Sequence, residues 1–208
     1  RPYHMLLLAQ NQIGYQNLLR LTSEAQLRGY YYRPRIDMEL LARHSEGIIA
    51  TSGCLAARIP SHVTEGEDDQ AREAIGQFVD IFGPDHFYLE LQQHDIPEVE
   101  KLNRWLVDYN RSHHTSVGLV ATNDTHYIRK EDYDAHDTLL CIQTNSLKCQ
   151  SDRLKMSDNS YYLSSPDEMW QVFKDVPDAI HNTYKIAEMC EIELERDEYH
   201  LPVFPVPP

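Results

Sequence analysis

Several common signatures of secreted, membrane and nucleotide-binding proteins are missing from this sequence of 208 residues. Its four cysteines include no Cys-x-x-Cys pair, no signal peptide is recognisable, and no apolar run approaches the roughly 20 residues that cross a membrane. Gly-x-Gly-x-x-Gly, Gly-x-x-x-x-Gly-Lys, Gly-x-Ser-x-Gly and His-Glu-x-x-His are also absent. These absences predict a cytoplasmic protein without disulfides or a membrane partner. They give no support to nucleotide-cofactor chemistry or serine hydrolysis.

Basic residues are scarce relative to acidic ones. Lysine and arginine total 19 against 33 aspartates and glutamates, which gives a formal charge of −14. A surface that neutralises phosphates should be basic, so we expect most of any grip on a nucleic-acid backbone to lie outside this segment. The chain begins with Arg-Pro and not with Met, so we expect it to be a segment of a larger protein.

Strand-like apolar runs alternate with amphipathic helical patterns along most of the chain. Strands are expected at residues 3–9, 48–51, 87–92 and 119–122, and helices at residues 15–27, 38–43, 67–82, 97–110 and 133–144. A short helical stretch is also expected after Cys54. This alternation is typical of an α/β fold with a largely parallel sheet. Asp37 is expected to cap the helix that begins at residue 38.

The last third of the sequence has a different character. Residues 161–163 form a candidate edge strand, Ser165 is expected to cap a short helix, and a second helix is expected at residues 178–190. Prolines in the tail, residues 200–208, force an extended path that is typical of a connector between domains.

The strongest local signal is the string ATNDTHY at residues 121–127, which follows a predicted buried strand. Residues two apart in an extended chain project to the same side, so Asp124 and His126 can reach one point. A carboxylate and an imidazole at the end of a parallel strand are typical metal ligands, and active sites of α/β barrels lie at that end. Spacing alone leaves a second interpretation open, in which Asp124 caps the next helical segment and His126 is a surface residue.

Cys54 has a similar position, because it follows a predicted strand and the turn residue Gly53. A thiolate there is suited to a transition metal, although a lone cysteine is more often a small buried hydrophobic residue. Cys141 and Cys190 lie in apolar helical patterns and are expected in the core. Cys149 lies in a polar loop and is given no role.

Three further side chains are candidates for a role near a metal. His4 lies at the start of its strand, where a histidine is usually only hydrogen-bonded, and not at the end that the barrel rule favours. Glu90 and His94 lie on either side of a strand end. Either they support the ligands of a metal site, or they form a solvated strand end. The residues alone indicate an α/β domain with, at most, an incomplete metal cluster.

Several strings resemble one known family. They are PYHMLLLA at residues 2–9, GYYYRPRID at 29–37, HSEGIIATSGC at 44–54, FYLELQQH at 87–94, ATNDTHY at 121–127, AHDTLLCIQT at 135–144 and YHLPVFPVP at 199–207. Together they resemble the polymerase and histidinol phosphatase (PHP) domain of the alpha subunits of bacterial replicative DNA polymerase III. The resemblance covers essentially the whole chain in order.

The resemblance implies an α/β fold that is an incomplete part of a distorted (β/α)7 barrel, similar to a TIM barrel. It implies that residues 1–190 are the later portion of the PHP domain and that residues 191–208 are a proline-rich linker leading into the polymerase palm. His4, Cys54, Asp124 and His126 fall on the family's ligand positions. The family's opening His-x-His motif, its Asp-His motif and its Glu ligand are not found, so we expect only part of the cluster here.

The implied cofactors are divalent metal ions, zinc or manganese at the PHP site and magnesium in the parent polymerase. The resemblance implies that the parent copies DNA in chromosome replication and that its PHP site is a metal-dependent 3′–5′ exonuclease or phosphoesterase. The alternative is a non-catalytic scaffold, since relatives that have lost ligands keep the domain in that role. A stand-alone histidinol phosphatase is disfavoured, because residues 161–173 and the tail match the polymerase subunit.

The implied partners are DNA, through the parent protein, and other replicase subunits such as the sliding clamp and an exonuclease subunit. We expect the isolated segment to be inactive as a polymerase and weak or inactive as a nuclease. Missing strands predict exposed apolar edges through which two copies pair.

Overall fold

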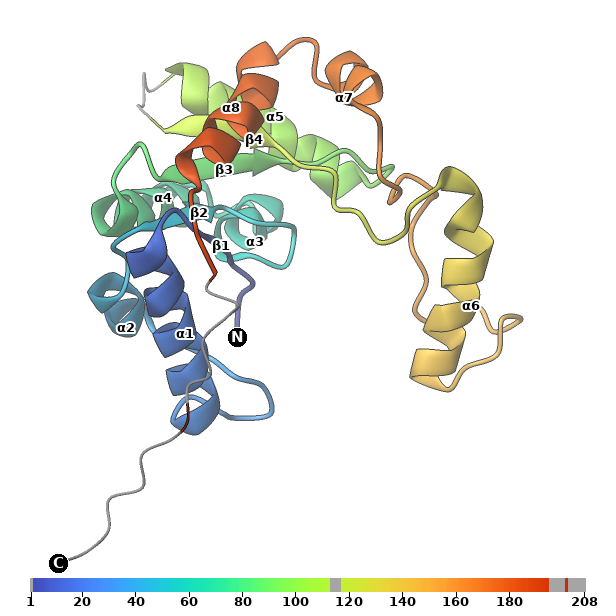
Figure 1. The fold of residues 1–208 in the computed structure, drawn as a ribbon. Coiled ribbons are helices and arrows are strands. Elements are labelled where there is room, and N and C mark those ends of the chain that lie inside the picture. The colour runs from blue at the N-terminus through green and yellow to red at the C-terminus, as the bar shows by residue number, and fades with distance from the viewer. Residues whose placement is uncertain (1, 113–116, 195–200, 202–208) are drawn as a thin grey trace, which may run out of the picture.

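A computed structural model of the chain describes residues 2–112, 117–194 and 201 (Figure 1). The strands are β1 (Leu6–Ala9), β2 (Ile48–Thr51), β3 (Phe87–Leu91) and β4 (Gly118–Ala121). The helices are α1 (Gln12–Leu27), α2 (Met38–Arg43), α3 (Arg58–Glu65), α4 (Asp68–Phe82), α5 (Pro97–Ser112), α6 (Tyr133–Thr144), α7 (Pro166–Val172) and α8 (Pro177–Met189), with a short 3-10 turn η1 (Lys130–Asp132). Each helix and strand expected in the first two-thirds of the chain is present, and α3 corresponds to the short helical stretch expected after Cys54.

The four strands form one sheet in the order β1-β2-β3-β4. Strands β2, β3 and β4 are parallel, as the alternation predicted, because helices connect each to the next. β1 runs antiparallel to β2, with Leu6 opposite Thr51 and Ala9 opposite Ile48. The connection through α1 and α2 returns the chain in the opposite direction, so the sheet is mixed.

The mixed α/β class is confirmed, but the expected barrel is not observed. Within the described residues the sheet is open, with β1 and β4 as its edges. Four short strands are too few to close a cylinder, because the common small barrels contain about eight strands. The half-exposed Leu6 lies on the β1 edge.

Alternate side chains of the sheet point to opposite faces, and both faces are covered. One face carries Ile48, Phe87 and Leu89, which pack with apolar residues of α3, α4 and α5 in the main core. The other face carries Ile49, Tyr88 and Val120, which pack against α8. Full burial of a large apolar side chain stabilises a fold by about 1.5–3 kcal/mol, so these two layers dominate the stability of the sheet.

Two predicted helix caps are confirmed. The Asp37 carboxylate accepts a hydrogen bond from the backbone N–H of Leu40 at 2.8 Å at the start of α2. Ser165 caps α7 and forms a reciprocal capping box with Glu168. Such caps satisfy backbone N–H groups that have no partner within the helix.

The predicted edge strand at residues 161–163 is wrong. Only an isolated parallel bridge between Tyr127 and Tyr162 forms there. The Asn123 side chain donates to the Tyr162 carbonyl at 2.9 Å and accepts from the backbone N–H of Ser164 at 2.7 Å. Backbone hydrogen bonds to residues 126–128 accompany the bridge at Tyr161 and Leu163, and the Asn123 side chain contacts the opposite backbone edge of the segment.

Helix α6 projects away from the sheet together with the loop that follows it, and we call residues 128–157 the α6 arm (Figure 1). The Arg153 guanidinium donates to both carboxylate oxygens of Asp137 at 2.6 and 2.7 Å. Cys141 is buried within the arm and lies outside both core clusters. Cys190, by contrast, packs against the second face of the sheet, as expected.

The proline-rich tail lies almost entirely outside the described residues, which include only Leu201 beyond residue 194. In the part of the chain that the structure describes, no helix combines the length and apolar character needed to cross a bilayer.

Candidate metal centre

The carboxyl ends of the parallel strands carry a polar layer on the face that α8 covers. Along each strand an apolar residue of that face is followed two positions later by a polar one: Thr51 after Ile49, Glu90 after Tyr88, and Thr122 after Val120. The alternation of a strand places each such pair on the same face. The polar layer therefore lies at the edge where α/β sheets hold their active sites.

Glu90 is the central residue of this layer and is only 5% exposed. Its carboxylate accepts hydrogen bonds from the hydroxyls of Thr51 at 2.5 Å and Thr122 at 2.6 Å. It also accepts one from the Gln92 amide at 2.9 Å, and the Glu90 backbone N–H donates to the Ser52 hydroxyl at 2.8 Å. A buried carboxylate requires such donors, so the alternative of a solvated strand end is wrong for Glu90.

Cys54 and His4 meet beside the end of β2. The Cys54 sulfur lies 4.0 Å from His4 Nδ1, and the His4 backbone N–H donates to the Ala56 carbonyl at 3.1 Å. Gly53 makes the turn with a φ of 73°, where an added Cβ would lie 2.9 Å from the Ala57 side chain. Cys54 is partly exposed and is not a core residue.

The antiparallel direction of β1 explains why His4 reaches this edge. Leu6 pairs with Thr51, the last residue of β2, so the chain that precedes Leu6 continues towards the turn at Gly53. The start of β1 thus lies beside the end of β2. A rule based on parallel strands alone does not predict this position for His4.

Asp124 and His126 lie beyond the end of β4. Asp124 adopts a positive φ of 49°, and its Oδ1 lies 3.9 Å from Nδ1 of His126. The same His126 nitrogen lies 2.8 Å from the Asp124 carbonyl oxygen, which holds the ring close to the carboxylate. Arg129, and not Asp124, is the N-cap of the next helical turn, so the capping alternative is wrong.

His94 is the most enclosed histidine at this edge. Its ring stacks on Tyr161 with centroids 3.9 Å apart, and its Nδ1 lies 2.7 Å from the Ser160 hydroxyl. Asp158 orders the loop that carries these partners, because it accepts from the backbone N–H groups of Asp95 and Ser160 at 2.6 and 2.7 Å. His94 is 5% exposed, so it too is not part of a solvated strand end.

The second ring nitrogen of His94 faces Asp124. Nε2 lies 3.3 Å from Asp124 Oδ2 but has no well-aligned hydrogen-bond partner among the described residues. The contact is therefore a close electrostatic one and not a full hydrogen bond. The pKa of Asp124 lies below its usual range because of the His94 contact and the charge of His126, which together outweigh burial.

The sequence did not indicate that two other side chains, those of His136 and Tyr161, lie beside His94 or His126. His136 on α6 lies with its ring centroid 6.0 Å from that of His126, and its Nδ1 is buried without a hydrogen-bond partner among the described residues. Tyr161 contacts both His94 and His126 through its ring. None of these three contacts is visible in the sequence, because His136 and Tyr161 lie 10 or more positions from the histidines they touch.

The candidate ligands thus form two pairs at one edge of the sheet, His4 with Cys54 after β2, and Asp124 with His126 after β4. Strand β3 separates the two pairs in the sheet. Across residues 2–112, 117–194 and 201, no three His, Cys, Asp or Glu side chains form a group that could hold an ion. The donor types nevertheless suit a borderline divalent cation, and the unaligned His94 Nε2 leaves a buried donor atom beside Asp124.

Comparison with known proteins shows the family to which the chain is similar. Residues 1–94 match the family model of the PHP domain. The chain is 46% identical over 189 residues to DNA polymerase III subunit alpha of Borreliella burgdorferi, covering 91% of this chain and 16% of that protein. It is 40% identical to the subunit of Thermus aquaticus and 38% to that of Treponema pallidum, covering 99% and 100% of this chain and 17% and 18% of those proteins.

The family model identifies residues 1–94 as part of a PHP domain. Over nearly its whole length, the chain belongs with the DNA polymerase III alpha subunits as a PHP-containing segment. It spans about one sixth of the length of the curated relatives that it matches.

Proposed function

We propose that this chain serves as the PHP portion of a replicative DNA polymerase alpha subunit, a DNA-directed nucleotidyltransferase of the cytoplasm. The observation that carries this proposal is 38–46% identity over at least 91% of the chain to subunits of that name. DNA, the sliding clamp and an exonuclease subunit are then partners of the parent protein. Polymerase chemistry and its magnesium ions belong to the parent, since the chain spans only about one sixth of its relatives.

The open sheet is proposed to be part of a barrel-like sheet within residues 1–190. Three observations support this: strands β2 to β4 are parallel with helical crossovers, one face changes from apolar to polar at the carboxyl ends, and β1 is an edge strand. An apolar layer below a polar rim is the arrangement that barrel enzymes use.

The site is proposed to bind zinc or manganese through His4, Cys54, Asp124 and His126, with Glu90 and His94 in support. A metal ion bound there would polarise a phosphodiester and supply hydroxide at neutral pH. Asp124 is suited to a cation because its lowered pKa keeps the carboxylate ionised well below neutral pH. His94, fixed by Ser160 and Tyr161, limits the orientations that the Asp124 carboxylate can adopt.

Metal binding is tested by calorimetric titration of the 208-residue chain with Mn²⁺ and, separately, Zn²⁺. Asp124→Asn should weaken binding about 10-fold or more, because the variant loses the ionised ligand. Asp85→Asn is the matched control, since Asp85 is an exposed carboxylate in the loop before β3, at the opposite end of that strand. Equal affinity of the two variants contradicts the assignment of Asp124.

Catalysis is tested separately with a 3′-labelled single strand and Mn²⁺ in the parent polymerase. Loss of 3′–5′ exonuclease activity in His126→Ala, with DNA synthesis retained, supports a nuclease site. If the wild-type polymerase and the His126→Ala variant have the same exonuclease activity, the site is not a nuclease site.

A non-catalytic scaffold is the second candidate, and one observation favours it. The four candidate ligands stand as two pairs, and the described residues contain no group of three. In this role, bound metal contributes only to folding. Metal-dependent stabilisation without any metal-dependent nuclease activity in the parent protein is the result that selects the scaffold.

A further inference from the structure

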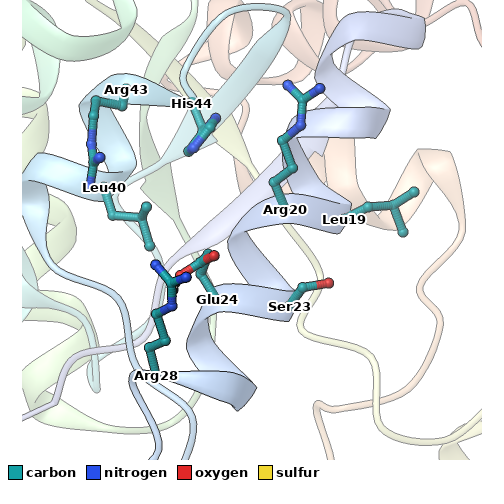
Figure 2. Close-up of a pocket in the computed structure, with 8 residues that line it drawn as sticks. All are labelled: Leu19, Arg20, Ser23, Glu24, Arg28, Leu40, Arg43 and His44. Carbon is teal, nitrogen blue, oxygen red and sulfur yellow. Dashed lines mark ion pairs between the residues drawn. The ribbon is translucent and has the colours of Figure 1, made fainter. Parts of the chain in front are cut away.

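A hollow of about 450 Å³ lies between α1 and α2, away from the candidate metal centre (Figure 2). Arg20 and Arg28 reach it from α1 and its C-cap, and Arg43 and His44 reach it from the end of α2. Glu24 is the single carboxylate in its lining. Three guanidinium groups around one hollow contrast with the chain's charge of −14.

The positive charge of this hollow is only partly compensated. Glu24 is already paired with Arg28 at 3.4 Å, and Figure 2 shows this pair at one end of the hollow. Arg20 donates to the neutral Asn17 amide oxygen at 3.2 Å, which orients the guanidinium without cancelling its charge. No ion pair joins Arg43 to another described residue. Two guanidinium groups therefore remain available to an anion.

The hollow also has apolar walls. Leu19, which is 51% exposed, lies on α1, and Leu40 lies on α2. A volume of about 450 Å³ lies in the range of small-ligand sites, with room for a nucleotide unit. Apolar walls beside guanidinium groups suit a ligand that carries both a phosphate and a flat apolar group.

The loop that begins just after Arg28, at one end of the hollow, carries exposed aromatic rings that are not part of the hollow's lining. Tyr30, Tyr31 and Tyr32 are 60%, 66% and 82% exposed, so none of them contributes to the core. The rings of Tyr31 and Tyr32 pack edge to face with centroids 4.6 Å apart, and the Arg35 guanidinium lies 4.9 Å from the Tyr31 centroid. The rings are thus ordered on the surface, where Arg35 lies over one face of Tyr31 and the remaining exposed ring surface is open to stacking.

We propose that this surface, the α1–α2 hollow with the tyrosine loop at residues 30–32, binds single-stranded nucleic acid. Backbone phosphates contact Arg20 and Arg43, and unstacked bases lie against the tyrosines. Basic grooves that alternate with aromatic stacking surfaces bind single strands in this way, with little sequence preference. This binding uses no metal ion, so it stands or falls independently of the metal centre.

A purely structural role of the arginines makes a different prediction. Arg28 and Arg43 lie at the C-terminal ends of α1 and α2, where a cation stabilises the helix dipole. Under that role, neutralising the arginines lowers the melting temperature and leaves binding unchanged. Under the proposal, binding falls and the melting temperature holds.

The test is fluorescence anisotropy of a labelled 12-residue oligothymidylate with the full 208-residue chain, at low ionic strength and in EDTA. The Arg20→Gln/Arg43→Gln variant should bind about fivefold more weakly or worse, and the salt dependence should fall by about 0.7 in log–log slope for each lost contact. Arg104→Gln/Arg111→Gln is the matched control, because both arginines lie on α5 and change the net charge equally.

Unchanged binding of the Arg20→Gln/Arg43→Gln variant, or an equal loss of binding in the Arg104→Gln/Arg111→Gln control, overturns the proposal. If the Arg20→Gln/Arg43→Gln variant unfolds, Ser23→Glu tests whether the hollow binds phosphates, because it adds a negative charge there. Ser23 is an exposed residue of α1 that lines the hollow, and glutamate is compatible with a helix. Ser23→Glu should also weaken binding, and wild-type affinity overturns the proposal.

Stacking is tested with Tyr31→Ser/Tyr32→Ser and with a competitor. The variant should lose affinity for the oligothymidylate, and polyglutamate of equal charge should compete poorly. Equal competition by polyglutamate, or wild-type affinity of the tyrosine variant, shows attraction of any anion and rejects nucleic-acid recognition.

Discussion

The sheet and the α6 arm are stabilised in different ways. The sheet is covered on both faces by helices, and side chains such as Ile59, Leu89 and Leu106 are fully buried. The arm leaves Leu139 and Ile142 62% and 72% exposed. Its loop is tied to α6 by the Arg153–Asp137 pair and by Lys148, which lies 2.6 Å from Asp134.

Because the sheet is held by apolar burial and the arm by charge pairs, the stability of the arm should depend more strongly on salt and pH. Burial of apolar surface changes little with salt or pH, whereas the exposed Lys148–Asp134 pair weakens with salt, and both pairs of the arm disappear when the carboxylates protonate. The sheet should therefore unfold as one cooperative unit, and the arm should open at lower free energy.

The largest contrast is expected from truncating one leucine in each region. Leu106→Ala removes a fully buried side chain from α5 and should reduce the free energy of unfolding by about 2–5 kcal/mol in urea titrations. Leu139→Ala on the exposed face of α6 should change it by less than about 0.5 kcal/mol. Similar losses in the two variants mean that the arm is covered in solution.

A smaller and local effect is expected from breaking the ion pair of the arm. Arg153→Met removes both hydrogen bonds to Asp137, a carboxylate that is 9% exposed, and leaves its charge without a partner. Backbone amides of α6 should exchange with solvent about tenfold faster or more, while those of β2 and β3 keep their protection. Faster exchange throughout the sheet contradicts the separation of the two regions.

The smallest effect concerns the cap of α7, another feature that depends on charge. Tyr162 and Ser165 donate hydrogen bonds to Glu168 and lower its pKa from 4.5 to about 2. A lowered pKa means that the contribution to stability is complete above about pH 4.5 and is lost as the pH falls towards 2. Glu168→Gln should melt a few degrees lower than the wild type at pH 6 and equally at pH 2. A difference that persists at pH 2 excludes the charge as its cause.

Much of the fold follows from local sequence patterns. Periodicity predicted the four strands, and Asp37 and Ser165 predicted helix starts that the structure confirms. Local patterns failed at residues 161–163, where the apolar and aromatic run forms a single bridge with Tyr127 and its other backbone edge contacts the Asn123 side chain. Secondary-structure propensities describe only neighbouring residues, so they do not predict a contact with Asn123, which lies about 40 positions away.

The candidate site was predictable only in part, for the same reason. The strand ends indicated Cys54 and Asp124, and these remain predictions as ligands. The burial of Glu90 depends on the registers that place Thr51 and Thr122 beside it, and the enclosure of His94 depends on Tyr161, 67 positions away. Periodicity also failed to distinguish α6 from a core helix, because both carry apolar residues at helical spacing.

Glu90 connects the two strand ends that carry the ligand pairs. Its two oxygens hold one hydroxyl from the strand that leads to Cys54 and one from the strand that leads to Asp124. In addition to the backbone pairing of the sheet, a single side chain that belongs to neither pair thus links the two strand ends. Shortening that side chain to aspartate would let both strand ends shift together, so one substitution would disturb two places that share no residue.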